Sequence, residues 1–310
     1  MKRFKNILVA TDTRFDSHPA VDEAVDIALQ SGAKLKIVDV VPEFSWTVRL
    51  TMKDHEHMRE LMSQEKQEKL DAMIAPLRDK GIDVQAKVLS GKTSVEVIRE
   101  VMRDDHDLVL RVNKGKESRR KGFFGNTGMR LLRKCPCAVW LIVLTRPQFQ
   151  HVLGCVDTTS EDKFDAELND EVFELAKSIS HHHGGTFSIA HAWSVLSESF
   201  LKNRMDHDDF VAMMKDHRDH AAKLFDRFLL RHGSNIDAEN VYLGKGDVSD
   251  VVSELIRRHS VDLVVMGTIA RSGMSGIVMG NTAEKILDRM ECSVLALKPS
   301  DFVCPIQMKD

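Results

Sequence analysis

Residues Asp107 to Cys137 read DLVLRVNKGKESRRKGFFGNTGMRLLRKCPC, and residues Asp262 to Cys292 read DLVVMGTIARSGMSGIVMGNTAEKILDRMEC. The two stretches align without a gap at a constant offset of 155 residues, which places Gly125-Asn126-Thr127 on Gly280-Asn281-Thr282. A repeat of this length indicates two similar structural units in one chain, and each unit needs its own functional argument.

Length and composition agree with two ordinary globular domains. A chain of 310 residues has a soft prior of about two domains. The hydrophobic content of 43% and the charged content of 29% are typical of soluble proteins, and a net charge of −3 gives no reason to expect nucleic acid or membranes as partners. We place the domains at residues 1–146 and 147–310, joined by a link too short to let them move independently.

Targeting and redox features predict a cytoplasmic protein. The first apolar run ends at Thr11-Asp12, too early for a signal peptide, and the run from Cys137 to Leu144 is too short to span a bilayer. We therefore expect no membrane insertion. The five cysteines cannot all pair, so we interpret them as reduced thiols.

Apolar runs that alternate with helical patterns predict an α/β fold with parallel sheets in both halves. In the first half we predict strands near 6–10, 35–41, 82–89, 108–112 and 138–144, and helices near 19–31, 55–80, 93–103 and 129–134. In the second half we predict strands near 152–156, 186–192, 238–243, 263–266 and 294–297, and helices near 167–182, 208–231, 248–259 and 282–290. Because Asp12 matches Asp157 at an offset of only 145, the second half carries ten extra residues, which we place between Trp193 and His207.

Several polar and glycine-rich positions of the second half fall where parallel sheets bind ligands, beyond the carboxyl ends of strands. Asp157 ends the first predicted strand and Ala192 the second, while Met266-Gly267 ends the fourth. Gly280-Asn281-Thr282 opens a helix, whose free N–H groups and dipole favour a phosphate. A structural turn is the competing interpretation, for the glycines as for Asp157.

The glycine spacing resembles the ATP-binding signature of the universal stress protein family, G-x₂-G-x₉-G-[S/T] after an apolar strand. Gly267 and Gly280 keep this spacing, whereas Ala270 replaces the second glycine and Asn281 the usual Ser or Thr. The motifs LRKCP at 132–136, GNTAE at 280–284 and Lys298-Pro299 are similar to the tandem type of that family. The resemblance covers both halves of the chain.

The resemblance implies two tandem five-stranded, Rossmann-like domains that pair through their last strands, here 139–143 and 293–297, as an intrachain pseudo-dimer. It also implies ATP or another adenine nucleotide in the second half, with Mg²⁺ as an open possibility. By the same resemblance, the adenine and ribose would lie against Asp157, Ala192, Met266 and Gly267, and the phosphates against Gly280, Asn281 and Thr282, with Arg271 as a helper.

The corresponding loop of the first half departs from this pattern. Val112 replaces the first glycine, and its branched side chain is expected to obstruct a nucleotide. The loop at 114–121 is strongly basic, which suits either an anion or nucleic-acid patch or a solvated loop; we favour the solvated loop and expect no nucleic-acid partner.

No nucleophile-and-base motif or metal-ligand spacing emerges, so we expect a binding protein rather than an enzyme, with slow ATP hydrolysis left open. The nucleotide would bias contact with an unknown protein partner, and a further homodimer is compatible with the sequence. The alternative is an apolar or lipid-like ligand, lined by Phe44, Trp46, Trp193 and the Met-rich helix at 205–214.

Overall fold

The computed structural model of the chain describes residues 3–44, 50, 54–113, 125–144, 148–159, 162–233, 236–268 and 279–308. Its first half contains β1 (Asn6–Ala10), α1 (Pro19–Ser31), β2 (Lys34–Val41), α3 (His55–Asp79), β3 (Val84–Ser90), α4 (Thr93–Arg103), β4 (Leu108–Asn113), α5 (Gly125–Lys134) and β5 (Ala138–Val143). Its second half contains β6 (His151–Cys155), α6 (Lys163–His182), β7 (Thr186–Trp193), α7 (Glu198–Lys202), α8 (His207–Arg231), the 3₁₀ turn η2 (Ala238–Asn240), β8 (Val241–Lys245), α9 (Val248–His259), β9 (Leu263–Gly267), α10 (Asn281–Arg289) and β10 (Ser293–Leu297).

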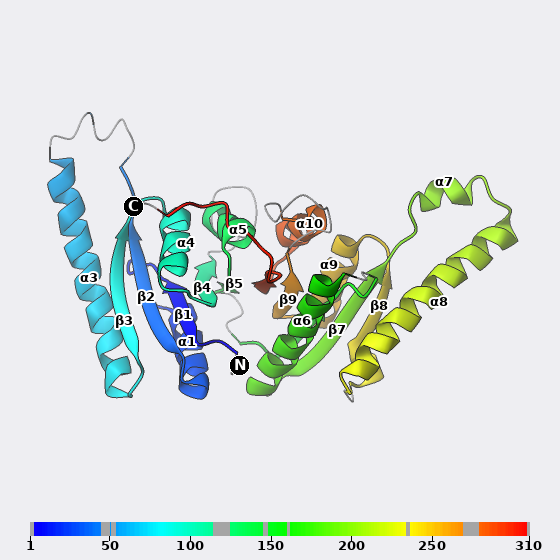
Figure 1. Cartoon of the computed structure of the whole chain (residues 1–310), viewed down its shortest axis with the longest axis horizontal. Coiled ribbons are helices and arrows are strands. Elements are labelled where there is room, and N and C mark those ends of the chain that lie inside the picture. Colours follow the sequence, from blue (N-terminus) through cyan, green and yellow to red (C-terminus); the bar gives the residue numbers. More distant parts are fainter. Residues whose placement is uncertain are drawn as a thin grey trace.

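All ten strands form one continuous sheet in the order β3-β2-β1-β4-β5-β10-β9-β6-β7-β8 (Figure 1). Each half is parallel throughout, and the halves meet where β5 pairs antiparallel with β10, Trp140 opposite Leu295. The predicted α/β fold and the pairing of the last strands are therefore confirmed. In both halves the strand order reverses next to the first strand, between β1 and β4 and between β6 and β9.

The two central strands are buried along their whole length because their sequences are continuous apolar runs. AVWLIV in β5 and SVLAL in β10 have no exposed position. A strand of this kind is stable only when both faces and both edges are covered. Pairing β5 with β10 covers the edge that each half would otherwise expose to solvent.

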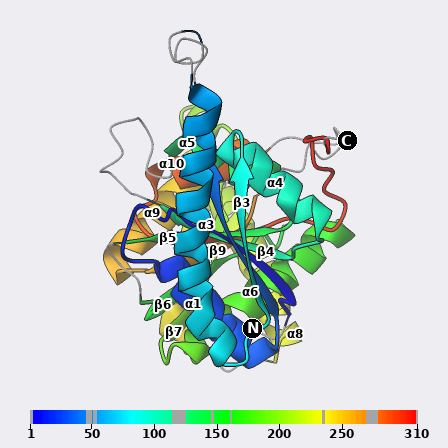
Figure 2. The ribbon, with the colours of Figure 1, turned by 90° about the vertical axis from the view of Figure 1, so that its left-hand side faces the viewer.

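Helices cover both faces of the sheet. One core cluster lies under α1, α3, α6 and α8, and the other lies under α4, α5, α9 and α10. The end-on view in Figure 2 shows the long helix α3 crossing in front of the β3 end of the sheet. Among the described residues, every helix is too short or too polar to span a bilayer.

Most of the ten extra residues of the second half do not lie where we placed them. The register separates Asn6 from Lys34 by 28 residues but His151 from Thr186 by 35, so seven of the ten precede β7. They lengthen α6 to 20 residues, against 13 in α1. Seven residues are close to two helical turns, so the longer helix keeps the same apolar face against the sheet.

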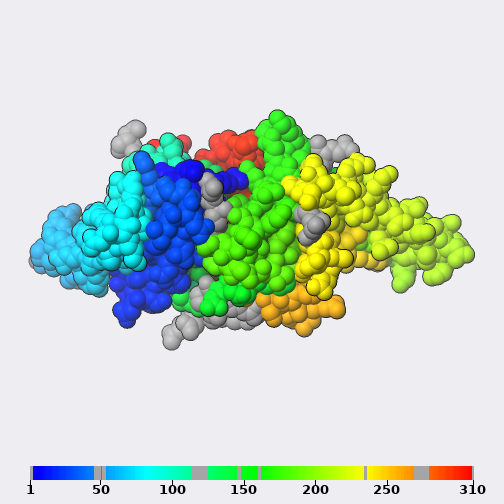
Figure 3. Space-filling view, turned by 90° about the horizontal axis from the view of Figure 1, so that it is seen from below, coloured from blue at the N-terminus to red at the C-terminus, as the bar shows by residue number. Residues whose placement is uncertain are grey.

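The remaining differences lie beyond β7. Three further residues separate β7 from β8 when compared with β2 and β3. The predicted start of β8 at Ala238 is wrong, because residues Ala238–Asn240 form η2. The short helix α7, which the sequence did not predict, forms with α8 an arm that projects from the end of the elongated molecule (Figures 1 and 3).

The carboxyl-terminal residues tie the second half to the first. The Lys298 ammonium is buried and donates hydrogen bonds to the Leu132 carbonyl at 2.5 Å and the Thr268 hydroxyl at 2.7 Å. Arg99 on α4 donates to the carbonyl of Gln307 at 3.1 Å. An ion pair between Arg133 and Glu284 joins α5 to α10.

Lys298 should make the stability of the join depend on pH. Burial lowers the pKa of Lys298 to about 8 from an ordinary value of 10.5. Between these values the unfolded chain binds a proton that the folded chain has lost, so stability rises with pH. The free energy of unfolding of the intact protein, relative to Lys298→Met, should rise by about 3 kcal/mol across this window. Urea titrations at pH 7 to 10.5 measure this free energy. If it changed with pH by the same amount in both proteins, the prediction would be contradicted.

Truncation at the seam should destabilise the whole molecule. Leu295 is fully buried opposite Trp140, so Leu295→Ala should lower the free energy of unfolding by about 2 to 5 kcal/mol. Leu230→Ala, at a side chain that is 80% exposed, is the matched control and should change it by less than about 0.5 kcal/mol. Denaturation followed by tryptophan fluorescence compares the two, and equal losses would show that the seam is not a major source of stability.

Candidate functional site

A cavity of about 360 Å³ lies beyond the carboxyl ends of β6, β7 and β9, against the first turn of α10. This is the switch point of the second half, where strand order reverses and open parallel sheets bind ligands. The lining residues come from β6, α6, β7, α9, β9 and α10 with their adjoining turns, and they are Cys155, Val156, Asp157, Asp165, Leu168, Asn169, His191, Ala192, Val248, Met266, Gly267, Gly280, Thr282, Ala283 and Ile286.

Asp157 is held at the mouth of this cavity by two sets of hydrogen bonds. The side-chain amide of Asn169, on α6, donates to the Asp157 carbonyl at 2.7 Å, and the Asp157 N–H donates back to the Asn169 Oδ1 at 3.0 Å. The Asp157 carboxylate accepts from the N–H and hydroxyl of Thr159 at 3.1 and 2.7 Å. The carboxylate therefore accepts hydrogen bonds within a turn, as the structural-turn interpretation of Asp157 expects. Asp157 is also exposed at the cavity.

Gly267 ends β9 at a place where a side chain would not fit. A Cβ at this position would lie 2.6 Å from the Leu168 Cδ2 of α6. Close packing of α6 on β9 thus explains this glycine without a ligand. Because Gly267 has no side chain, only its backbone lines the cavity.

The first turn of α10 forms the opposite wall. Gly280 is the N-cap in an extended conformation, and no described side chain caps the helix. The Gly280 N–H donates to the Thr268 carbonyl at 3.1 Å, which fixes the helix start relative to β9. The N–H groups of an uncapped first turn remain available to an anion.

Cations of α10 point away from this wall. Lys285 lies 3.5 Å from Asp247, and Arg289 pairs with Asp250, both on the side of α9. The carboxylates of Asp157 and Asp165 line the cavity. Among the described residues, backbone amides and the Thr282 hydroxyl are therefore the groups suited to an anion here.

The structure brings together six of the eight predicted site residues. Asp157, Ala192, Met266, Gly267, Gly280 and Thr282 line the cavity. Asn281 opens α10 and is exposed beside the cavity without lining it. Arg271 lies outside the described residues, as do Ala270 and the basic loop at 114–121.

Among the lining residues that the sequence analysis did not predict are His191 and Asn169. His191 is buried, with its Nδ1 3.2 Å from the Val156 carbonyl and its ring 5.7 Å from that of Phe225. It directly precedes Ala192, so its position at a strand end was a usable signal. Asn169 gave no such signal, because its role depends on how α6 packs against β6.

A second cavity, of about 430 Å³, occupies the equivalent place in the first half. Val112 lines it and packs half-buried against the core, so the branched side chain narrows the site without closing it. Arg111 stands in the position that Met266 holds in the second half, at the same offset of 155 residues. The residues proposed for an apolar site, Phe44 and Trp193, line neither cavity in the described structure, and Trp46 lies outside it.

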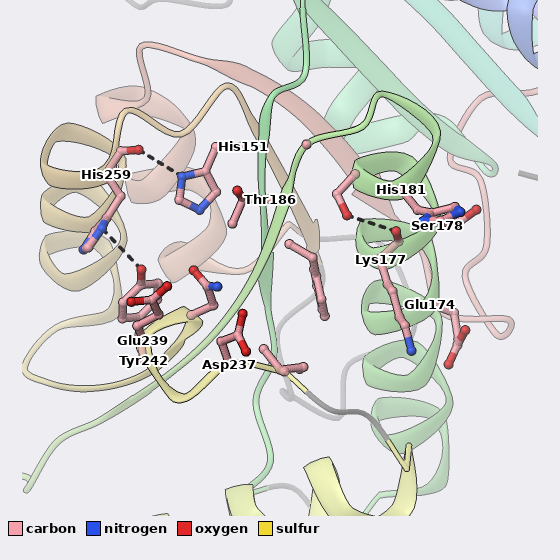
Figure 4. A pocket seen from close by; sticks show the side chains of 15 residues that line it. His151, Glu174, Lys177, Ser178, His181, Thr186, Asp237, Glu239, Tyr242 and His259 are labelled. Carbon is pink, nitrogen blue, oxygen red and sulfur yellow. Dashed lines mark hydrogen bonds between the residues drawn. The ribbon is translucent and has the colours of Figure 1, made fainter.

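A wider groove of about 1050 Å³ lies at the amino ends of β6 and β7 (Figure 4). Lys177 and His181 of α6 line one side of it, and Tyr242 of β8 lies on the other. Three ring side chains of the groove are engaged in structural contacts. His151 Nδ1 lies 2.9 Å from the His259 carbonyl, and the Tyr242 hydroxyl lies 3.3 Å from His259 Nδ1. Parallel sheets bind ligands at their carboxyl ends, so we assign the functional site to the smaller cavity.

Comparisons with known proteins place both halves in one family. The family model described as "Universal stress protein family" matches residues 3–142 and again residues 148–298. Universal stress protein E of Escherichia coli K12 is 26% identical to this chain, over 100% of the chain and 99% of that protein. The protein of the same name from Photorhabdus laumondii is 27% identical, over 99% of each.

Solved structures agree at the level of the fold. A protein of unknown function from Pseudomonas aeruginosa PAO1 matches with a TM-score of 0.72 and 21% identity, covering 97% of this chain and 94% of its own. A universal stress protein from Archaeoglobus fulgidus matches with a TM-score of 0.61 and 18% identity, covering 96% and 99%. With two matches to its model and relatives that span its full length, the chain belongs to the universal stress protein family.

Proposed function

We propose that the second half binds ATP or a related adenine nucleotide and that the bound state regulates contact with a protein partner. The observation that carries this proposal is a cavity that joins the Asp157 turn to the uncapped first turn of α10. The two ends of the cavity differ chemically, with a carboxylate at one and helix amides at the other. A nucleotide has matching ends, because its base and ribose carry donors and its phosphates carry negative charge.

Each predicted residue then has a role that its chemistry allows. The Asp157 carboxylate would accept from the ribose hydroxyls or the adenine amino group, and the backbone beside Ala192 would flank the base. The buried Met266 and the bare Gly267 would contact the base and sugar. The amides of Asn281 and Thr282 and the Thr282 hydroxyl, at the helix start that Gly280 caps, would hold the phosphates, without a cation from the described part of α10.

Binding rather than turnover fits this arrangement. Within the described residues no group of three His, Cys, Asp or Glu side chains is placed to hold a metal ion. Binding that is equally strong for the bound and the reacting phosphates does not accelerate chemistry. The nucleotide would act by binding one conformation of the protein better than another.

Calorimetry tests the site directly. ATP titrated into the full chain should bind at one site, and Gly280→Trp should weaken binding at least tenfold by filling the cavity. The backbone at Gly280 has a negative φ, so tryptophan is sterically allowed there. The matched control is Thr127→Trp on the first turn of α5, which should leave the Kd unchanged. A full chain that shows no heat with ATP, or equal losses in both variants, would refute the proposal.

The role of Asp157 can be separated from its role in the turn. Asp157→Asn keeps the Oδ1 that accepts from Thr159 but loses the charge, so folding should be unchanged. Binding of ATP and of adenosine should weaken about tenfold, the loss of one charge-assisted hydrogen bond. Asp162→Asn, at the N-cap of α6, is the control and should bind normally. Unaltered affinity of Asp157→Asn would leave Asp157 as a turn residue only.

A further inference from the structure

The first-half cavity contains a cation where its counterpart contains a thioether. Arg111 lies in β4 next to Val112, and both line the cavity together with Thr11, Asp12, Phe15 and His18. Methionine at this position, as in the second half, needs no polar partner. Arginine is always charged and presents five donors, so its placement in a cavity wall calls for acceptors.

The protein supplies few of those acceptors. In the described structure the Arg111 guanidinium makes a single hydrogen bond, from Nη1 to the Ala10 carbonyl at 3.3 Å. Burial lowers the pKa of Arg111, which means that its surroundings disfavour the charge despite two nearby carboxylates. Arg111 is half-buried, and an anion that enters the cavity would supply acceptors for the guanidinium donors that the protein leaves without one.

The two nearby carboxylates are engaged with other cations. Asp12 accepts from the Arg14 Nε and Nη2 at 2.8 and 2.7 Å. Asp39, which occupies the position of His191 in the second half, accepts from the Lys66 ammonium at 2.5 Å. Each of these two carboxylates is paired with its own cation, so neither is left to neutralise Arg111, and the exposed Asp16 is the remaining carboxylate of the cavity wall.

The cavity wall includes exposed apolar side chains beside the exposed Asp16 and Ser17. Phe15 is 47% exposed and Leu144 is 44% exposed, and both line the cavity beside Val112. Large apolar side chains left open at the rim of a pocket are suited to the body of an organic ligand. A volume of about 430 Å³ falls within the range of small-molecule sites.

We propose that the first half binds a small organic acid, with a single carboxylate on the Arg111 guanidinium and a compact apolar body against Phe15, Val112 and Leu144. The planar guanidinium matches a carboxylate in a bidentate pair. A polyphosphate suits the cavity less well, because Asp12 and Asp16 also line it and repel multiple negative charges. Val112 places a branched side chain in the cavity wall at the position where the other half has Gly267.

The probe is 1-naphthoate, with the uncharged 1-naphthamide as its isostere, titrated calorimetrically into the full chain. Naphthoate should bind with a submillimolar Kd and at least tenfold more tightly than the amide. Arg111→Met, which installs the residue of the second half, should weaken naphthoate at least tenfold and leave the ATP titration unchanged. Arg130→Met, at an exposed position of α5, is the matched control and should bind both ligands normally.

Folding of the variant is controlled in two ways. Arg111→Met should keep or raise the melting temperature, because it removes a poorly compensated charge. Arg111→Lys keeps the charge without the planar fork and should bind naphthoate several-fold more weakly. No heat with naphthoate up to millimolar concentration, equal affinity for the amide, or unchanged affinity in Arg111→Met would each overturn the proposal. Because ATP is titrated separately, the outcome is independent of the nucleotide site.

Discussion

The antiparallel pairing of β5 with β10 is the contact on which the rest of the structure depends. Each of these strands is apolar on both faces, so neither half could leave it as an edge without exposing its most hydrophobic segment to water. Their pairing turns two five-stranded sheets into one sheet of ten strands and makes the two core clusters continuous across the molecule. The helices, the two cavities and the projecting arm are arranged around that central pair.

The two cavities show how one scaffold supports two chemistries. Both lie at a switch point, where the loops after two strands diverge and leave space. In the second half the wall consists of Met266 and a glycine, and the helix start beyond it is uncapped. In the first half an arginine and a valine replace that pair. Two adjacent substitutions in one strand therefore change the cavity from one with bare backbone to one with a fixed cation and an apolar wall.

Much of this fold could be predicted from the sequence, because local signals and global packing agree. The bounds of α1, α4 and α9 match the prediction, since Pro19, Thr93 and Val248 begin clear amphipathic patterns. Most of the extra residues were misplaced because the two helical turns that they add to α6 preserve the apolar stripe and do not alter the periodicity. The clamp of Asn169 on Asp157 could not be foreseen, since it depends on a helix packing angle that no local pattern encodes. The place of Arg111 in a cavity wall was not predicted for another reason. A single charged residue does not alter the prediction of a strand from an otherwise apolar run.

The buried Lys298 connects the two halves of the chain beside the cavity of the second half. Its ammonium bonds Leu132 on one side and Thr268 on the other, and the Thr268 carbonyl in turn holds the amide of Gly280. The second copy alone would thus lose more than a covering strand, because the start of α10 would lose one of its supports. After such a duplication, the residues that line the two pockets can diverge. The residues that pair the two halves remain constrained, because each half must still fit the other.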